Sequence, residues 1–284
     1  PRDWSSDVCS SDLTGASITY QWQQSLNGCN GPWNNINGAT SATYTIANAP
    51  VTLDNTAYRC IVNGTCTAAL TSGCGLLTVV APTTVTTQPI SQTVCDGAAV
   101  TFTTAGSGTG VLYQWQVNTG AGFTNLTNGG IYSGVTTASL SISATNPAMN
   151  GYQYRCLLSN AVCTTPVNTN TITLTVNTLP AISSQPQSQT TCSSTTVSFT
   201  VGATGTGVQY QWQVNTGTGF TNLTNTGNYA GATTATLVVS NTTVAMSGYQ
   251  YRCVVSGTCT PSVNSSAVTL PVYAPVVEIG RAHV

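Results

Sequence analysis

The sequence has 284 residues, of which only 4% are Asp, Glu, Lys or Arg, and its formal net charge is −1. An ordinary domain carries roughly 25% charged residues, and the near-neutral balance excludes the basic surface with which proteins bind nucleic acid or an anionic membrane. No apolar run reaches the roughly 20 residues that a membrane-spanning helix needs.

The two ends of the chain differ from the middle and are related to each other. Codons can be chosen for Asp7–Leu13 whose opposite strand encodes Glu278–Val284, and this DNA resembles a sequencing-library adapter. We therefore expect residues 1–13 and 278–284 to be translated adapter and the natural chain to be cut at both ends. As with other segments that do not belong to a fold, they are set aside before structure is predicted.

The middle of the chain consists of repeats. Tyr113–Gly120 returns as Tyr210–Gly217, 97 residues later, and 23 of the 31 positions that begin at Tyr113 are identical in the two copies. Tyr20–Gln23 marks an earlier copy. A period near 97 residues fits one small domain per repeat. The prediction is a first repeat (14–81) that lacks its opening strands, a second repeat (82–178) and a third repeat (179–277).

Apolar and polar side chains alternate within each repeat, which predicts strands with one buried face. Gly and Asn clusters separate these segments, as in a β-sandwich. Asn63-Gly64 and Ser256-Gly257 are expected to form two-residue hairpin turns between the last two strands. The expected fold class is all-β, and the strands of the second repeat are expected, in chain order, at residues 100–103, 113–117, 140–142, 152–158 and 172–176.

Each repeat has a Trp and, about 40 residues later, the sequence Tyr-x-Cys. This pattern resembles the immunoglobulin fold, in which the Trp lies on the third strand and packs in the core, and the Tyr before the sixth-strand Cys forms a "tyrosine corner". The repeats, including Gly-Tyr-Gln-Tyr-Arg-Cys, are also similar to the immunoglobulin-like repeats of very large secreted Bacteroidetes proteins. The resemblance covers residues 14–277. It implies tandem immunoglobulin-like antiparallel β-sandwiches with a core signature of Trp22, Tyr58, Trp115, Tyr154, Trp212 and Tyr251.

Ten cysteines lie outside the two ends, without a histidine or a close Cys-x-x-Cys pair among them. Disulfides formed in an oxidising, extracellular compartment therefore explain them better than a zinc site does. In contrast to the antibody pattern, no cysteine stands near Thr104 or Val201, where the second-strand half-cystine belongs. The candidate disulfide cysteines are Cys29, Cys60, Cys66, Cys74, Cys95, Cys156, Cys163, Cys192, Cys253 and Cys259.

Two connectivities stay open for the complete repeats. One joins neighbours across the last hairpin, as Cys156–Cys163 and Cys253–Cys259. The other joins the early cysteine to the late one, as Cys95–Cys163 and Cys192–Cys259. Cys29 and Cys74 occur only in the first repeat, which suggests a bond between them.

Three arginines, Arg59, Arg155 and Arg252, directly precede the cysteine of the sixth strand and are expected to point outward from the same sheet face. Arg offers a fork of donors and a stacking plane, so these residues are candidate contacts for a glycan, a partner or an adjacent domain. The alternative is that each Arg lies over side chains of its own repeat. At another recurring position, Trp33, Phe123 and Phe220 are expected to be half-buried aromatic residues.

Residues 14–277 contain two aspartates and no Lys, Glu or His. They offer no general base, no activated nucleophile and no carboxylate cluster for calcium. The sequence therefore predicts no enzyme activity, no cofactor and no metal.

The favoured function is a non-catalytic structural or spacer segment of a secreted or cell-surface protein, with adhesion as one such role. One alternative is a carbohydrate- or protein-binding module. The other is an accessory region of a secreted hydrolase. The expected partners are a surface polysaccharide or another surface protein, with no nucleic acid and no membrane span.

Overall fold

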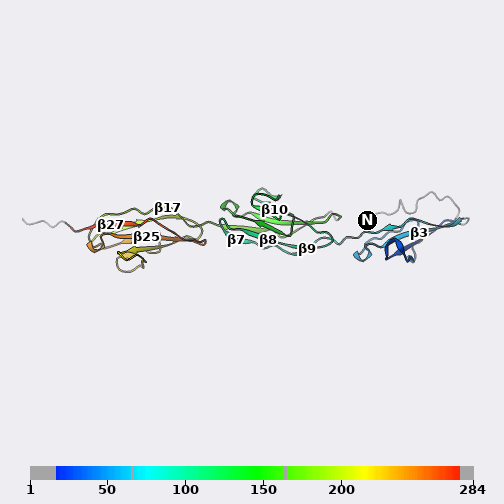
Figure 1. Ribbon diagram of the computed structural model, residues 1–284, viewed down its shortest axis with the longest axis horizontal. Coiled ribbons are helices and arrows are strands. Elements are labelled where there is room, and N and C mark those ends of the chain that lie inside the picture. Colours follow the sequence, from blue (N-terminus) through cyan, green and yellow to red (C-terminus); the bar gives the residue numbers. More distant parts are fainter. Residues whose placement is uncertain (1–16, 65–66, 163–164, 276–284) are drawn as a thin grey trace, which may run out of the picture. The chain divides into compact units, whose positions relative to one another are not determined.

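The computed structural model describes residues 17–64, 67–162 and 165–275. In these ranges the regular structure consists of β-strands and short 3-10 turns, without an α-helix (Figure 1). This confirms the expected all-β fold class. No helix in the described ranges is long and apolar enough to cross a membrane. Both ends expected to derive from an adapter lie outside these ranges.

The chain divides into two compact units. The first contains the residues up to Thr87 together with Ala105–Tyr113 and Leu157–Asn168. The second contains Gln88–Thr104, Gln114–Cys156 and the residues from Thr169 onward. This division does not follow the repeats, so the domain boundaries at residues 82 and 179 stay a prediction.

The first repeat contributes a single sheet within residues 17–81 of the described chain. Its strand order is β2-β1-β3-β4, and β5 also pairs with β3. Trp22 stands opposite Cys60 on the neighbouring strand. The side chains of Trp22, Tyr44 and Tyr58 line a cavity of about 420 Å³. The strands are β1 (Thr19–Ser25), β2 (Asn34–Asn35), β3 (Ala57–Gly64), β4 (Thr67–Thr71) and β5 (Gly75–Leu76).

The second repeat contains a large sheet of order β11-β10-β14-β16-β7, with β15 also on β14, and a small sheet of order β12-β13-β8. A further pair joins β6 and β9. The strands are β6 (Thr84–Thr87), β7 (Gln92–Cys95), β8 (Val100–Thr103), β9 (Ala105–Ser107), β10 (Leu112–Asn118), β11 (Phe123–Asn125), β12 (Tyr132–Ser133), β13 (Ser139–Ile142), β14 (Gln153–Ser159), β15 (Val167–Asn168) and β16 (Ile172–Asn177). All five predicted strands are present.

The third repeat has the same arrangement, with sheets β22-β21-β25-β26, in which β27 also pairs with β25, and β19-β24-β23. Two further pairs are β17-β20 and β18-β28. The strands are β17 (Ala181–Ser184), β18 (Thr191–Cys192), β19 (Val197–Thr200), β20 (Gly202–Thr204), β21 (Gln209–Asn215), β22 (Phe220–Asn222), β23 (Tyr229–Ala230), β24 (Thr236–Val239), β25 (Tyr249–Ser256), β26 (Val263–Asn264), β27 (Val268–Leu270) and β28 (Val272–Tyr273).

The buried core follows the period of two. Phe102 on the small sheet packs against Tyr154 and Trp115 on the large sheet, with ring centroids 5.2 and 6.4 Å apart. Phe199, Trp212 and Tyr251 repeat this cluster in the third repeat. Because alternate side chains of a strand face the same side, these rings fill the space between the two sheets.

The core signature is confirmed in part. Trp115, Tyr154, Trp212 and Tyr251 have no exposed surface and Trp22 is 4% exposed, whereas Tyr58 is only half-buried. No second sheet covers Tyr58 in the described part of the first repeat, which accounts for the difference.

The tyrosine hydroxyls also differ from the expected corner. The hydroxyl of Tyr154 lies 3.2 Å from that of Tyr132, and the hydroxyl of Tyr251 lies 3.4 Å from that of Tyr229. The partner in these pairs is therefore another side chain of the same repeat.

The two expected hairpin turns are misplaced. Asn63 and Gly64 lie within β3, and the two residues that follow are outside the described ranges. Ser256 ends β25, and the next strand begins only at Val263. The longer turn contains Cys259, whose bond partner lies outside the third repeat.

Candidate functional site

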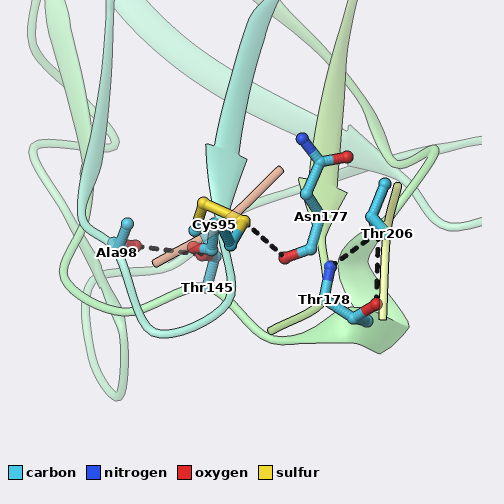
Figure 2. The surroundings of a disulfide bond; sticks show 7 residues. Cys95, Ala98, Thr145, Asn177, Thr178 and Thr206 are labelled. Atoms are coloured by element: carbon cyan, nitrogen blue, oxygen red, sulfur yellow. Dashed lines mark hydrogen bonds between the residues drawn. A yellow bond between two sulfur atoms is a disulfide. The ribbon is translucent and has the colours of Figure 1, made fainter. Parts of the chain in front are cut away.

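A disulfide between Cys95 and Cys259 links the second repeat to the third (Figure 2). The two Cα atoms are 5.8 Å apart, within the usual range for a disulfide. The bond encloses a long stretch of chain, because the two cysteines are 164 residues apart in sequence. Both belong to the second compact unit.

Cys95 is held at the end of β7, which runs parallel to β16 and places Cys95 beside Asn177. The amide of Asp96 donates to the carbonyl oxygen of Asn177 (2.9 Å). The Thr145 hydroxyl lies 3.1 Å from the carbonyl oxygen of Cys95 and 3.0 Å from that of Ala98. Backbone pairing and the threonine therefore fix the position of this half-cystine (Figure 2).

Cys259 lies in the turn after β25 and is 1% exposed. The amide of the preceding Thr258 donates to the carbonyl oxygen of Thr206 (2.8 Å). Thr206 also bonds Thr178, since its hydroxyl accepts from the Thr178 amide (2.9 Å) and its own amide donates to the Thr178 carbonyl oxygen (3.1 Å). The sulfur of Cys259 lies 3.6 Å from the carbonyl oxygen of Asn177. The turn is thus bound to the segment that joins the two repeats, whose Thr178–Thr206 contacts Figure 2 shows.

Gly257 permits the close approach of this turn. A Cβ atom at this position would lie 2.9 Å from the carbonyl oxygen of Thr206, which is closer than a side chain tolerates. A glycine two residues before Cys259 therefore lets the turn reach the hydrogen bonds that orient the cysteine.

The disulfide corrects the predicted connectivity. Cys259 pairs with Cys95, so the pairs Cys192–Cys259, Cys253–Cys259 and Cys95–Cys163 are all wrong. Cys66 and Cys163 lie outside the described residues. The predicted pair Cys156–Cys163 therefore also lies outside them. The predicted bond between Cys29 and Cys74 is confirmed, with a sequence separation of 45 residues.

The cysteines of β3, β14 and β25, which correspond to the sixth strand of the immunoglobulin fold, are core residues. Cys60, Cys156 and Cys253 have no exposed surface. Burial raises the pKa of the Cys156 and Cys253 thiols to about 11, so these thiols stay protonated at neutral pH. The thiolate is the reactive form of cysteine, and both residues are therefore chemically inert packing groups.

The three arginines have the same surroundings in each repeat. The guanidinium carbons of Arg59, Arg155 and Arg252 lie 4.1–4.2 Å from the ring centroids of Trp33, Phe123 and Phe220, respectively. All three arginines and all three aromatic residues are half-buried. The expectation of a shared half-buried aromatic residue is confirmed, and each guanidinium stacks on a side chain of its own repeat.

A glutamine completes each arginine site. The Nε of Arg155 donates to Oε1 of Gln116 (2.7 Å), whose Nε2 donates to Asn125 (2.8 Å). The Nε of Arg252 donates in the same way to Gln213 (2.8 Å), and that of Arg59 donates to Gln23 (2.8 Å). These contacts agree with the alternative in which the arginines lie over their own repeat.

The described residues offer little other chemistry. No group of three or more His, Cys, Asp or Glu side chains that could hold a metal ion occurs among them. Cys192, by contrast, is exposed and forms no disulfide within the described ranges. The distinctive chemical feature of the molecule is its pattern of cysteines.

Among comparisons with known proteins, those with solved structures support the fold. A family model described as a domain of unknown function (DUF8696) matches residues 4–81. No curated protein matches the sequence. The I-band fragment I67–I69 from titin is similar in structure, with a TM-score of 0.63 at 15% identity, covering 91% of this chain and 89% of that one.

A variant of the same three-domain titin fragment gives a TM-score of 0.62 at 16% identity, with the same coverage. The domains D1–D2 of Rst give 0.50 at 17% identity, covering 68% of this chain and all of that one. At such low identity the similarity establishes the fold alone. The chain therefore has the fold of tandem immunoglobulin-like domains.

Proposed function

We propose that this chain is a non-catalytic spacer in an extracellular array of immunoglobulin-like domains, and that disulfides across the repeat junctions limit how far the array extends under load. The proposed domains are 14–81, 82–178 and 179–277. The observation that carries the proposal is the Cys95–Cys259 bond, which joins two consecutive repeats.

Two further observations support an extracellular spacer. Disulfides persist in oxidising compartments and are rare in the cytosol, and two of them occur among the described residues. The arginines that the sequence offers as candidate contacts for a glycan or a protein are engaged by aromatic and glutamine side chains of their own repeats. The large secreted Bacteroidetes proteins that the sequence resembles would provide such an array.

The disulfide changes the covalent path along which force is transmitted. A pulling force on the two ends of the chain passes from Cys95 directly to Cys259 through the disulfide. The chain between these cysteines, which are 164 residues apart in sequence, therefore does not extend under the force. Even if both repeats unfolded, this stretch would stay slack while the bond is intact. The length held back is roughly 540–590 Å at 3.3–3.6 Å per residue.

Single-molecule force extension of the chain, held at its two ends without reductant, tests the proposal. The double variant Cys95→Ser, Cys259→Ser should release additional length of roughly 540–590 Å over the unmodified chain. The matched control, Cys29→Ser with Cys74→Ser, should release only roughly 150–160 Å, because its cysteines are 45 residues apart.

Equal final lengths for the unmodified chain and the Cys95→Ser, Cys259→Ser variant would contradict the proposal, since the bond would then carry no load. Specific capture of a glycan or a protein, lost on Arg155→Ala and Arg252→Ala, would indicate a binding module instead of a spacer.

A further inference from the structure

Cys192 occupies in the third repeat the position that Cys95 occupies in the second. The two residues are 97 positions apart, the length of the repeat. Cys95 ends β7 and stands beside Asn177 in a parallel pair. Cys192 ends β18 and stands beside Tyr273 in a parallel pair. In the second and third repeats, the same short parallel pairing thus places a cysteine at the end of the strand pair.

The hydrogen bonds around the two cysteines also correspond. Thr242, 97 positions after Thr145, places its hydroxyl 2.9 Å from the carbonyl oxygen of Cys192 and 3.2 Å from that of Thr195. The amide of Ser193 donates to the carbonyl oxygen of Tyr273 (2.9 Å), as the amide of Asp96 does to Asn177. The setting that positions Cys95 for its bond is therefore built a second time.

The two cysteines differ in whether they form a disulfide. Cys95 is bonded to Cys259, in the turn after the sixth strand of the next repeat. Cys192 is exposed and forms no disulfide with any described residue. In sequence, a cysteine follows the sixth-strand cysteine by six or seven positions in each of the three repeats. A partner for Cys192 is thus a standard feature of a repeat of this kind.

We infer that Cys192 is the open half of a second junction disulfide, and that its partner is the turn cysteine of a further repeat of the same kind joined head to tail after the third. The inference rests on the proposed function and extends it. In such an array, the early-strand cysteine of each repeat bonds the turn cysteine of the next repeat. Successive disulfides therefore connect an array of any length.

The chemistry of the bond is thiol–disulfide exchange. The Cys192 thiolate attacks a small disulfide such as oxidised glutathione and releases one thiol. The turn cysteine then attacks the mixed disulfide and releases the second. Two protein thiols are oxidised to one disulfide, and one small disulfide is reduced to two thiols.

The test compares the full chain with an extended chain, in which residues 179–284 follow Ala274 a second time with Cys192→Ser in the added copy, so that Cys192 stays unique. Both chains are equilibrated with oxidised and reduced glutathione. In the full chain, native alkylation should label Cys192 and spare the buried Cys253. In the extended chain, labelling of Cys192 should fall to the level of Cys253. Mass spectrometry of a non-reduced digest should find Cys192 linked to Cys259, a pair that the full chain lacks because its Cys259 is bonded to Cys95.

Two controls keep the test decisive. Cys192→Ser at the remaining position of the extended chain should leave one Cys259 open to alkylation, and protection of both copies of Cys253 shows that the added repeat has folded. If the added repeat is folded and Cys192 is still labelled, or forms dimers through Cys192 of another molecule, the inference is wrong. If the Cys95–Cys259 peptide pair is also missing from the full chain, the proposed function fails with it.

Discussion

Arg59, Arg155 and Arg252 make the same two kinds of contact in the three repeats. Each guanidinium lies over an aromatic ring and donates through Nε to a glutamine on the neighbouring strand, as Arg252 does with Phe220 and Gln213. Residues 14–277 contain no lysine and no other arginine, so these side chains are the only cations of that segment. Their half-buried stacking connects the outer face of the large sheet to its edge.

A double-mutant cycle on Arg252 and Phe220 measures this stacking. Arg252→Ala, Phe220→Ala and the double variant should give a coupling energy of roughly 0.5–1 kcal/mol, as expected for a partly exposed cation–π pair. The free energy of unfolding of the third repeat, from urea titration, is the readout. The equivalent pair, Arg155 and Phe123, should couple to the same extent. Additive single losses would show that the arginines do not depend on the rings and are available to another partner.

At the scale of the element, the sequence predicted the strands but not the connectivity of the cysteines. Alternation of apolar and polar residues identifies a strand and its buried face, and the Trp and Tyr-x-Cys positions identify two strands of the core. Alternation carries no information on whether a strand pairs parallel or antiparallel. The parallel pairing of β7 with β16 decides which end of the sandwich Cys95 reaches.

That pairing brings Cys95 to the junction with the third repeat. Cys95 lies beside Asn177 at the end of β16, roughly 20 Å along the strand from Ile172, where β16 begins. At this end Cys95 meets Cys259, in the turn of the following repeat.

The Cys29–Cys74 bond is the main constraint on the sheet of the first repeat. Its cysteines are 45 residues apart, and closing such a loop contributes about 4 kcal/mol in the chain-entropy model. The double variant Cys29→Ser, Cys74→Ser should therefore be cleaved by protease within residues 17–81 about tenfold faster or more, since each 1.4 kcal/mol corresponds to a factor of ten. Limited proteolysis followed by mass spectrometry measures the rate. An unchanged rate would mean that the sheet is stable without this bond.

At the scale of the whole molecule, the repeats of the sequence predicted the tandem fold, because the same core positions return with the same period. They do not predict the compact units, which cut through the second repeat. Compactness depends on contacts across strands and junctions, such as those of Thr206 with Thr178 and Thr258. These residues are ordinary polar positions in the sequence, and only the folded chain brings them together.

The first and third repeats differ in how much core they have, and this predicts different folding behaviour for isolated fragments. In the described residues, the buried cluster of the first repeat consists of Trp22, Cys60 and Val62. That of the third repeat includes Phe199 and Trp212 among fourteen residues, most of which lie on two facing sheets.

Residues 179–277, with Cys192→Ser and Cys259→Ser to prevent cross-linking, should therefore unfold in one cooperative thermal transition with an enthalpy of roughly 60–80 kcal/mol, as is typical of a 100-residue domain. Residues 14–81 should show no such transition, because their buried cluster is this small and Trp22, Tyr44 and Tyr58 line a cavity of about 420 Å³ beside it. Scanning calorimetry of the two fragments measures both outcomes. A sharp transition for residues 14–81 would show that one sheet and the Cys29–Cys74 bond suffice for a cooperative fold.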